Sequence, residues 1–363
     1  MGVYLFCFAL FFSLLLIRDR RYFYAVFIVL FGIMGLRDMV GSKDIYNYAY
    51  SYEMYSIRDY LKYDKAEIGF QLYTIALKTI SDNRYFYFFV TSFVIGFLQL
   101  FSSWNLARSK VFYWVAFIVL CRFYLLDFIV LRQLMCIGVA WLALGYFYHG
   151  QRFRALLFFL IALTLHRSAL ILIPTFFLLS MNLNFRKAVI TYGLLLLLVF
   201  SGAFFVIKNQ AFYQLAVHWS HFGKLAGYVT PAPYYKWIYL VELPMVVAVL
   251  YFLRKKRVSG NRNDLFNLTF GYGALLIVSI AEPILIRMAW FFFLGFAYAL
   301  SLLLYHIRDK KKAWVLRGAV VVYFSMIFFR FLFFYHGGDM LPYKSIFDDF
   351  DRKGDYDYME YRK

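Results

Sequence analysis

Long apolar runs recur along the chain and constrain its fold more than any other feature. A helix that spans a bilayer needs roughly 20 apolar residues, and shorter runs suffice where the bilayer thins. The mean hydropathy of +0.64 and the charged fraction of 16% lie far from those of soluble domains. The sequence therefore predicts an all-α integral membrane protein with about twelve transmembrane helices. These helices are predicted at residues 3–17, 22–36, 85–104, 111–126, 131–148, 153–165, 168–181, 188–207, 237–253, 265–282, 287–305 and 313–334.

The basic residues predict which ends of these helices face the cytoplasm. The net charge is +19, but Lys and Arg form short clusters between apolar runs and no continuous basic face, which argues against nucleic acid as a partner. Alternate connections carry these clusters, and by the positive-inside rule those connections are cytoplasmic. Both termini and residues 37–84 and 208–236 then lie outside. The clusters are Arg18/Arg20/Arg21, Arg108/Lys110, Arg152/Arg154, Arg186/Lys187, Arg254/Lys255/Lys256/Arg257/Arg262 and Arg308/Lys310/Lys311/Lys312.

Residues 153–180 could form one long helix or two short helices separated at His166-Arg167. A single helix would invert the downstream topology and place the clusters at 254–257 and 310–312 outside. Charge therefore favours two short helices, with His166 and Arg167 in a recess that opens outward.

The two outer segments differ in character, within a membrane domain at 1–335. In residues 37–84, the helical spacing of Ile68, Leu72, Ile75 and Thr79 predicts an interfacial or re-entrant helix on the outer face. Residues 208–236 are predicted to form an ordered cap. Residues 336–363 form a short, acidic, Tyr-rich tail on the outer side. The three cysteines lie inside apolar runs and offer no metal-binding spacing, so no metal is expected.

Charged residues inside or at the edges of spans are the main functional signal. An Arg or Lys at a helix centre costs roughly 2.5–3.5 kcal/mol on insertion, so such residues need partners or a wet cavity. On the predicted topology, every such charged residue except Arg317 lies near the outer end of a helix. Structural ion pairs are the alternative explanation for these charges. Arginine matches phosphate oxygens bidentately, so the cluster predicts an anionic, lipid-borne phosphate. The outer charges are Arg37, Arg122, Arg132, Arg167, Glu242, Glu282, Arg287 and Arg330.

His166 is the first candidate for a general base, because it can accept a proton near neutral pH. Glu67 and Asp44 are the alternative bases. A hydrogen-bonded packing role for the histidine, and surface ion pairs for the carboxylates, are the competing interpretations. Tyrosines crowd residues 46–55, where most would pack or belong to the interfacial belt, and a minority could stack on sugars.

Several short motifs, in order along the chain, resemble the EpsG family of Wzy-type polysaccharide polymerases. They are Gly35-Leu36-Arg37 with Gly41, Asp44 and Tyr48; Glu67-Ile68-Gly69-Phe70; Leu131-Arg132-Gln133 with Ala140; His166-Arg167-Ser168-Ala169-Leu170 with Pro174; and Pro342-Tyr343. Leu165 and Lys43 depart from the family pattern, which often has an aromatic residue before the histidine and a small residue before the aspartate.

The resemblance implies a fold similar to the GT-C glycosyltransferases and the O-antigen ligases. It also implies two substrates: a growing glycan on undecaprenyl diphosphate, and a new lipid-linked repeat unit as acceptor. The protein would then lie in the bacterial cytoplasmic membrane with its active site facing the periplasm or exterior. A chain-length regulator and a flippase would be possible partners.

The resulting hypothesis is a glycosyltransferase that needs no cofactor. A base deprotonates the acceptor hydroxyl, which displaces undecaprenyl diphosphate from the donor sugar. Arg37, Arg132, Arg167 and Arg287 would bind the diphosphate, and Gln133 and Tyr48 would orient sugar or phosphate oxygens. The alternatives are a ligase that transfers to another acceptor, and a flippase or transporter for lipid-linked sugars. A membrane acyltransferase would also use a histidine, but His149 and His306 lack polar companions.

Overall fold

The computed structural model describes residues 1–62, 67–107, 110–218, 229, 235–255, 262–334 and 338–347. These residues fall into two compact units, each described here by itself. Unit 1 comprises Met1–Leu170 and Leu304–Lys363, and unit 2 comprises Ile171–Leu303. Both units are helical. The described strands are two two-residue segments in unit 1.

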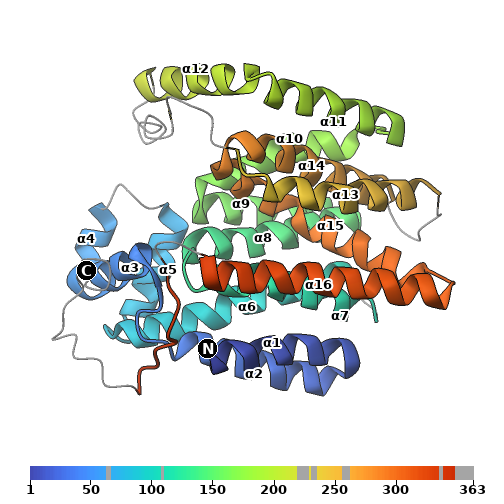
Figure 1. Ribbon diagram of the computed structural model, residues 1–363. Coiled ribbons are helices and arrows are strands. Elements are labelled where there is room, and N and C mark those ends of the chain that lie inside the picture. The colour runs from blue at the N-terminus through green and yellow to red at the C-terminus, as the bar shows by residue number, and fades with distance from the viewer. Residues whose placement is uncertain are drawn as a thin grey trace. The chain divides into compact units, whose positions relative to one another are not determined.

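Unit 1 contains the first nine α-helices, the last α-helix and the strand pair (Figure 1). Its elements are α1 (Gly2–Leu16), α2 (Arg20–Gly35), β1 (Gly41–Ser42), α3 (Lys43–Met54), α4 (Ile57–Lys62), α5 (Ile68–Lys78), α6 (Arg84–Ala107), α7 (Phe112–Asp127), α8 (Leu131–Tyr148), α9 (Arg152–Leu165), α16 (Lys310–Phe334) and β2 (Gly338–Asp339).

Helix α8 is almost entirely buried in unit 1 and packs against α6 and α9. Two glycines allow the close approach to α6, because a Cβ on Gly138 would lie 2.7 Å from Leu98 Cβ and one on Gly145 would lie 3.0 Å from Asn105 Nδ2. Ser102 Oγ donates to the carbonyl oxygen of Gly138 at 2.8 Å. Small residues and short hydrogen bonds between helices are typical of packing in membranes, where lipid competes with apolar contacts.

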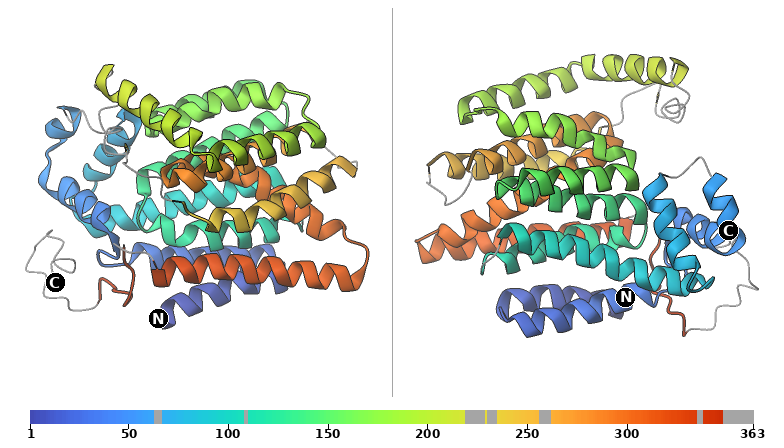
Figure 2. Two further views of the ribbon diagram at one scale, coloured as in Figure 1. Left: turned by 45° about the horizontal axis from the view of Figure 1, so that its top comes forward. Right: turned by 180° about the vertical axis from the view of Figure 1, so that it is seen from behind.

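Helices α3, α4 and α5 lie at one end of the unit 1 bundle, together with the strand pair (Figures 1 and 2). The antiparallel strands pair Gly41 with Asp339 and Ser42 with Gly338. Gly41 has φ +146, a conformation that favours glycine, and a Cβ there would lie 3.0 Å from the carbonyl oxygen of Phe128. This turn leads the chain from the end of α2 into α3.

The basic connections of unit 1 lie at the opposite end of the bundle. The α1–α2 and α15–α16 connections lie at that end (Figure 1). His149 at the end of α8 lies with Nε2 2.8 Å from the carbonyl oxygen of Asn105, near the end of α6. Within unit 1, the two sets of connections thus alternate as the charge pattern predicts. Which end faces the cytoplasm stays a prediction.

Unit 2 contains α10 (Leu172–Ser180), α11 (Phe185–Phe200), α12 (Ala203–His218), α13 (Ile238–Lys255), α14 (Arg262–Ala281), η3 (Pro283–Leu285) and most of α15 (Ile286–His306). Helix α14 packs against α10, α11 and α13. Close contacts between α14 and its neighbours again use glycine, since a Cβ on Gly271 would lie 2.6 Å from the Phe292 ring. The short helix η1 (Arg167–Ile171) begins in unit 1 and ends at the first residue of unit 2.

The chain is an integral membrane protein with several helices that can span a membrane. Among the described residues, five helices are long and apolar enough to cross a membrane, or six if α11 and α12 count as one bent span. Several of the other predicted spans form helices too short for that test, so the twelve spans are not confirmed. The five are at Arg84–Ala107, Leu131–Tyr148, Asn263–Ala281, Pro283–His306 and Lys310–Phe334.

The prediction of one continuous helix at 188–207 is wrong. Helix α11 ends at Phe200, and α12 begins at Ala203 after a bend of 77°. Gly202 in the break has φ +78, which a residue with a side chain rarely adopts. Helix α12 extends to His218, so the first part of the predicted cap at 208–236 is helical. The rest of that cap, apart from 229, 235 and 236, lies outside the described residues.

The helix predicted within residues 37–84 is present as α5, and its outer-face position stays a prediction. The buried face of α5 is opposite to the face formed by the apolar residues on which the prediction rested. Phe70, Thr74 and Leu77 are buried, whereas Ile68 and Leu72 are each more than half exposed. An amphipathic helix that exposes isoleucine and leucine fits the predicted interfacial position.

The predicted tail begins as an ordered strap, which we define as residues 338–347. It lies against unit 1, where Tyr4 Oη donates to the carbonyl oxygen of Met340 at 2.7 Å. Asp38 N donates to Lys344 O at 2.9 Å, and Tyr343 Oη donates to Ile33 O at 2.7 Å. Residues 348–363 lie outside the described residues.

Candidate functional site

Glu67, Arg132, His166 and Arg167 meet at one end of unit 1, and we call them the Glu67 cluster. The Glu67 carboxylate joins two elements: Oε2 lies 3.0 Å from Arg132 Nη1, and Oε1 accepts a hydrogen bond from the Arg167 backbone N–H at 2.9 Å. The Arg132 and Glu67 side chains are 24% and 12% exposed, so the ion pair lies at a partly buried position. The Arg167 residue is exposed.

Local sequence explains why these residues meet. Glu67 precedes α5 in an extended conformation, and Arg132 lies in the first turn of α8. Gly69 in α5 lies against α9, because a Cβ there would lie 2.8 Å from the Thr164 carbonyl oxygen. The Glu67-Ile68-Gly69 motif thus places Gly69 against the last turn of α9 and brings the Glu67 carboxylate to the Arg167 amide just beyond it.

The predicted break at His166 is confirmed. Helix α9 ends at Leu165, His166 has extended backbone angles of φ −160 and ψ 131, and η1 follows. Cys136 lies one helical turn after Arg132, and its Sγ is 3.3 Å from the Ala162 carbonyl oxygen and 3.8 Å from that of His166. Helix α8 therefore contacts the end of α9 immediately beside the Arg132 turn.

The His166 ring is oriented by Ser168. Nδ1 accepts a hydrogen bond from the Ser168 backbone N–H at 3.0 Å, and Ser168 Oγ lies 2.7 Å from the same nitrogen. A backbone N–H can only donate, so Nδ1 must present its lone pair and the neutral ring carries its proton on Nε2. In this conformation Nε2–H is a hydrogen-bond donor. This geometry does not favour the predicted role of general base for His166.

The other predicted residues of unit 1 take different positions relative to the cluster. Gln133 follows Arg132 and is buried at 2% exposure. Tyr48 on α3 is partly buried, with its ring centroid 6.0 Å from that of Phe70 on α5. Asp44 is exposed and lies one helical turn before Tyr48. Tyr48 thus contacts α5, the helix that begins directly after Glu67.

Arg37 has a structural environment, and the geometry does not support its predicted binding of diphosphate. The side chain is 0% exposed. Its guanidinium donates to the carbonyl oxygen of Met34, to Ser92 Oγ at 3.1 Å and to the Phe128 carbonyl oxygen at 3.3 Å, and lies over the Phe88 ring. Burial lowers the pKa of Arg37 to about 10, so it remains protonated at neutral pH. Arg37 joins the end of α2 to α6 and to the α7–α8 turn.

Arg287, the fourth predicted diphosphate ligand, lies in the first turn of α15 in unit 2. Two other charges of unit 2 have protein partners: Glu282 Oε2 accepts from Lys208 Nζ at 2.9 Å, and Glu242 Oε1 accepts from Tyr272 Oη at 2.7 Å. Glu242 and Glu282 therefore fit the alternative explanation, in which charged residues near helix ends pair with other protein side chains.

Sequence reasoning missed the residues that orient the cluster. Ser168 and Cys136 sit within the motifs at 166–170 and after 131–133, but nothing in their spacing specifies a hydrogen bond to His166. Asp127, which is fully buried and accepts from Gln99 Nε2 at 2.7 Å, could have been noticed as an acid inside an apolar run. Among the described residues, no three His, Cys, Asp or Glu side chains are placed to hold a metal ion, and the metal-free site stays a prediction.

The end motifs of the chain also meet in unit 1. The Arg37 backbone bridges to Ser345, and the amide of Ile346 donates to the carbonyl oxygen of Leu36 at 3.0 Å. The Pro342-Tyr343 motif therefore belongs to a strap that covers the Gly35-Leu36-Arg37 motif.

No match was found among curated proteins or among solved structures. A family model described as EpsG family matches residues 20–345, which is most of the chain and includes every member of the Glu67 cluster. The chain belongs to the EpsG family.

Proposed function

We propose that the chain is a polysaccharide polymerase that joins undecaprenyl-diphosphate-linked repeat units at the outer face of the bacterial cytoplasmic membrane. It would transfer the growing glycan to a hydroxyl of a new lipid-linked unit. Membership in the EpsG family and the membrane-spanning helices support the general activity. The single observation that carries the proposed site is the Glu67 carboxylate, which contacts both the Arg132 guanidinium and the Arg167 backbone N–H at one end of unit 1.

The diphosphate leaving group needs positive charge and hydrogen-bond donors. The hydroxyl oxygen attacks the anomeric carbon, the bond to the diphosphate oxygen breaks, and undecaprenyl diphosphate leaves with the electron pair. Arg132 and Arg167 would stabilise the new charge, and His166 Nε2–H would donate to a phosphate or sugar oxygen. Donors that are already oriented before reaction are usually the largest contribution to such catalysis.

The hydroxyl proton needs an acceptor other than Nδ1 of His166. Glu67 already binds Arg132 and the Arg167 amide, so its first role is to position them. Asp44, exposed on α3 and one turn from Tyr48, is the proposed base. Tyr48 and Gln133 would orient sugar or phosphate oxygens.

The test is a reaction with purified protein, a synthetic undecaprenyl diphosphate repeat unit and no nucleotide sugar. Products are resolved on a gel for the native protein and for His166→Ala. A ladder from the native protein that weakens strongly in the variant supports the proposal. A substrate that is competent with another polymerase but gives no ladder here would contradict it. Transfer to a different acceptor would then favour a ligase, and lipid movement across vesicles would favour a flippase.

A further inference from the structure

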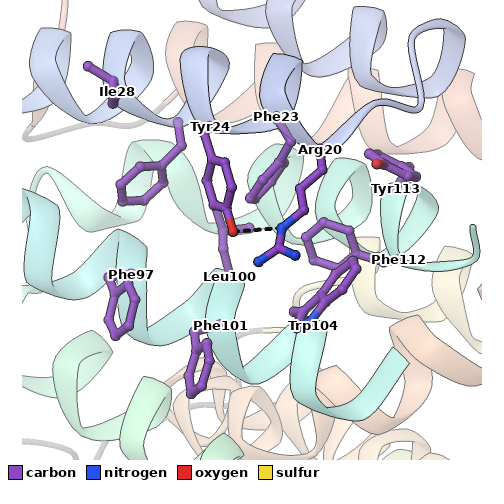
Figure 3. Close-up of a pocket in the computed structure, with 11 residues that line it drawn as sticks. Arg20, Phe23, Tyr24, Ile28, Phe97, Leu100, Phe101, Trp104, Phe112 and Tyr113 are labelled. Carbon is purple, nitrogen blue, oxygen red and sulfur yellow. Dashed lines mark hydrogen bonds between the residues drawn. The ribbon is translucent and has the colours of Figure 1, made fainter. Parts of the chain in front are cut away.

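An apolar cavity at the basic end of unit 1 has features of a lipid site. Its volume is about 490 Å³, within the roughly 300–1,000 Å³ typical of small-molecule sites. It lies between α2 and α6 and reaches the start of α7, with mainly aromatic walls (Figure 3). Tyr24, Ile28, Phe97 and Phe101 line it and are each more than a third exposed, so the cavity opens to the surroundings of the protein.

Within the described part of the chain, Arg20 is the one charged residue that lines this cavity. Its Nε donates to Tyr24 Oη at 2.9 Å, and its guanidinium lies 5.5 Å from the Tyr24 ring centroid and 5.9 Å from that of Trp104. Figure 3 shows the guanidinium between Tyr24 and Trp104. These contacts use Nε and the faces of the rings. Among the described residues, none accepts a hydrogen bond from the two Nη atoms, so these donors are available to an external anion.

The charge around Arg20 also favours an anion. Arg18, Arg21 and Lys110 lie at the same end of unit 1, and all three are exposed. The nearby carboxylate of Asp19 is engaged as the N-cap of α2, where it accepts from the Tyr22 amide at 2.9 Å. Each basic residue near a membrane surface strengthens binding of anionic lipid.

We propose that this cavity binds an anionic phospholipid, with the phosphate at the Arg20 Nη atoms and an acyl chain along the aromatic walls. The lipid-linked substrate is a poorer fit, because the Glu67 cluster lies at the other end of unit 1 (Figure 1). On the predicted topology, the bound lipid belongs to the cytoplasmic leaflet. The site does not depend on the proposed polymerase activity.

Trp104 provides a spectroscopic probe inside the cavity. The purified protein is placed in two series of nanodiscs. One series contains increasing fractions of phosphatidylglycerol with brominated acyl chains, and the other contains increasing fractions of brominated phosphatidylcholine. Bromine quenches the fluorescence of a nearby tryptophan. The chain has seven tryptophans, so the Trp104 contribution is the difference between the native protein and Trp104→Phe. We expect brominated phosphatidylglycerol to reach half-maximal quenching of Trp104 at a lipid fraction about fivefold lower than brominated phosphatidylcholine does. A fivefold difference corresponds to about 1 kcal/mol, the usual contribution of one basic residue to the binding of anionic lipid.

Arg20→Gln should abolish this preference for the anionic lipid. Arg21→Gln is the matched control, because Arg21 is the exposed neighbour that does not line the cavity, and it should retain most of the preference. Equal quenching by both lipids, no Trp104 quenching at all, or equal effects of the two variants would overturn the proposal. Displacement of phosphatidylglycerol by a smaller fraction of polyprenyl phosphate would also overturn it, in favour of a site for the substrate lipid.

Discussion

At the scale of single residues, the Glu67 carboxylate has the largest structural consequence in the candidate site. It holds the Arg132 guanidinium at 3.0 Å and the Arg167 amide at 2.9 Å, and these partners come from two different elements. Without the carboxylate, a partly buried arginine and a backbone N–H would both lose their partner, which is costly where water is scarce. The residue therefore acts on the site through its neighbours.

Glu67→Gln should lower polymer formation by about tenfold or more, because the neutral amide cannot pair with Arg132 and accept from the Arg167 amide with the same strength. Glu67→Asp, which keeps the charge on a shorter side chain, should retain more activity. Product ladders from purified variants of equal thermal stability measure this. Full activity of Glu67→Gln would rule out the positioning role.

The Ser168–His166 hydrogen bond predicts how substitutions of the histidine differ. If Nε2–H donates to substrate, His166→Gln should retain clearly more activity than His166→Ala, because the glutamine amide can donate from a similar place. Initial rates of polymer formation compare the two. Equal, complete loss in both variants, combined with rescue of His166→Ala by an added imidazole base, would instead indicate proton abstraction by His166.

At the scale of helices, the distance between α5 and α9 determines where Glu67 lies. Gly69 is required by this contact, since a Cβ would lie 2.8 Å from both Thr164 Cβ and the Thr164 carbonyl oxygen. A backbone oxygen cannot move aside as a flexible side chain can.

Gly69→Ala should therefore destabilise unit 1 by about 1–3 kcal/mol, the usual cost of overpacking. Gly32→Ala on α2 is the control: a Cβ there meets nothing within 4 Å, so the change should be neutral or stabilising by about 0.5–1 kcal/mol. Thermal unfolding in detergent measures both. Unchanged stability and activity of Gly69→Ala would contradict the contact.

Most helices could be predicted from the sequence, and the contacts of the site could not. Apolar runs with charged ends located α6, α8 and α16 to within a few residues, because lipid requires long apolar helices. The break at His166 followed from the charge pattern, whereas the break at Gly202 was missed because an apolar run continues across it. The helical spacing of apolar residues predicted α5, but those residues lie on its exposed face and not on its buried face. Apolar spacing alone does not distinguish the two faces, because lipid and protein neighbours favour similar residues.

The residues of the candidate site could also be predicted from the sequence only in part. Glu67, Arg132 and His166 could be selected as charged or titratable residues at outer helix ends, but the residues themselves do not specify that Glu67 bridges the other two segments. Arg37 satisfied the same criterion and is enclosed by Ser92, Phe88 and Phe128. Burial depends on helix packing across long sequence separations, and a single sequence does not encode that packing in any local pattern.

At the scale of the whole molecule, unit 1 carries the candidate site at one end and the basic connections at the other. This polarity predicts that the two ends face opposite sides of the membrane, with the Glu67 cluster outside. The three native cysteines are buried, so engineered cysteines can report on each end.

Tyr50→Cys and Lys311→Cys test this orientation, because both positions are exposed and lie at opposite ends of unit 1. In intact spheroplasts, a membrane-impermeant maleimide should label the cysteine at 50 and should label the cysteine at 311 only after permeabilisation. The reverse pattern would place the candidate site on the cytoplasmic side and contradict the proposed use of outward-facing lipid-linked units.

The most direct test of the central claim compares Arg132→Ala with Arg317→Ala in the purified polymerisation assay. Both changes remove a partly exposed arginine of unit 1, but Arg132 pairs with Glu67, whereas Arg317 donates to the Leu304 carbonyl oxygen near the basic end. With equal amounts of folded protein, Arg132→Ala should lose nearly all polymer and Arg317→Ala should retain most of it. Equal loss in the two variants, or a normal ladder from Arg132→Ala, would contradict a site at the Glu67 cluster.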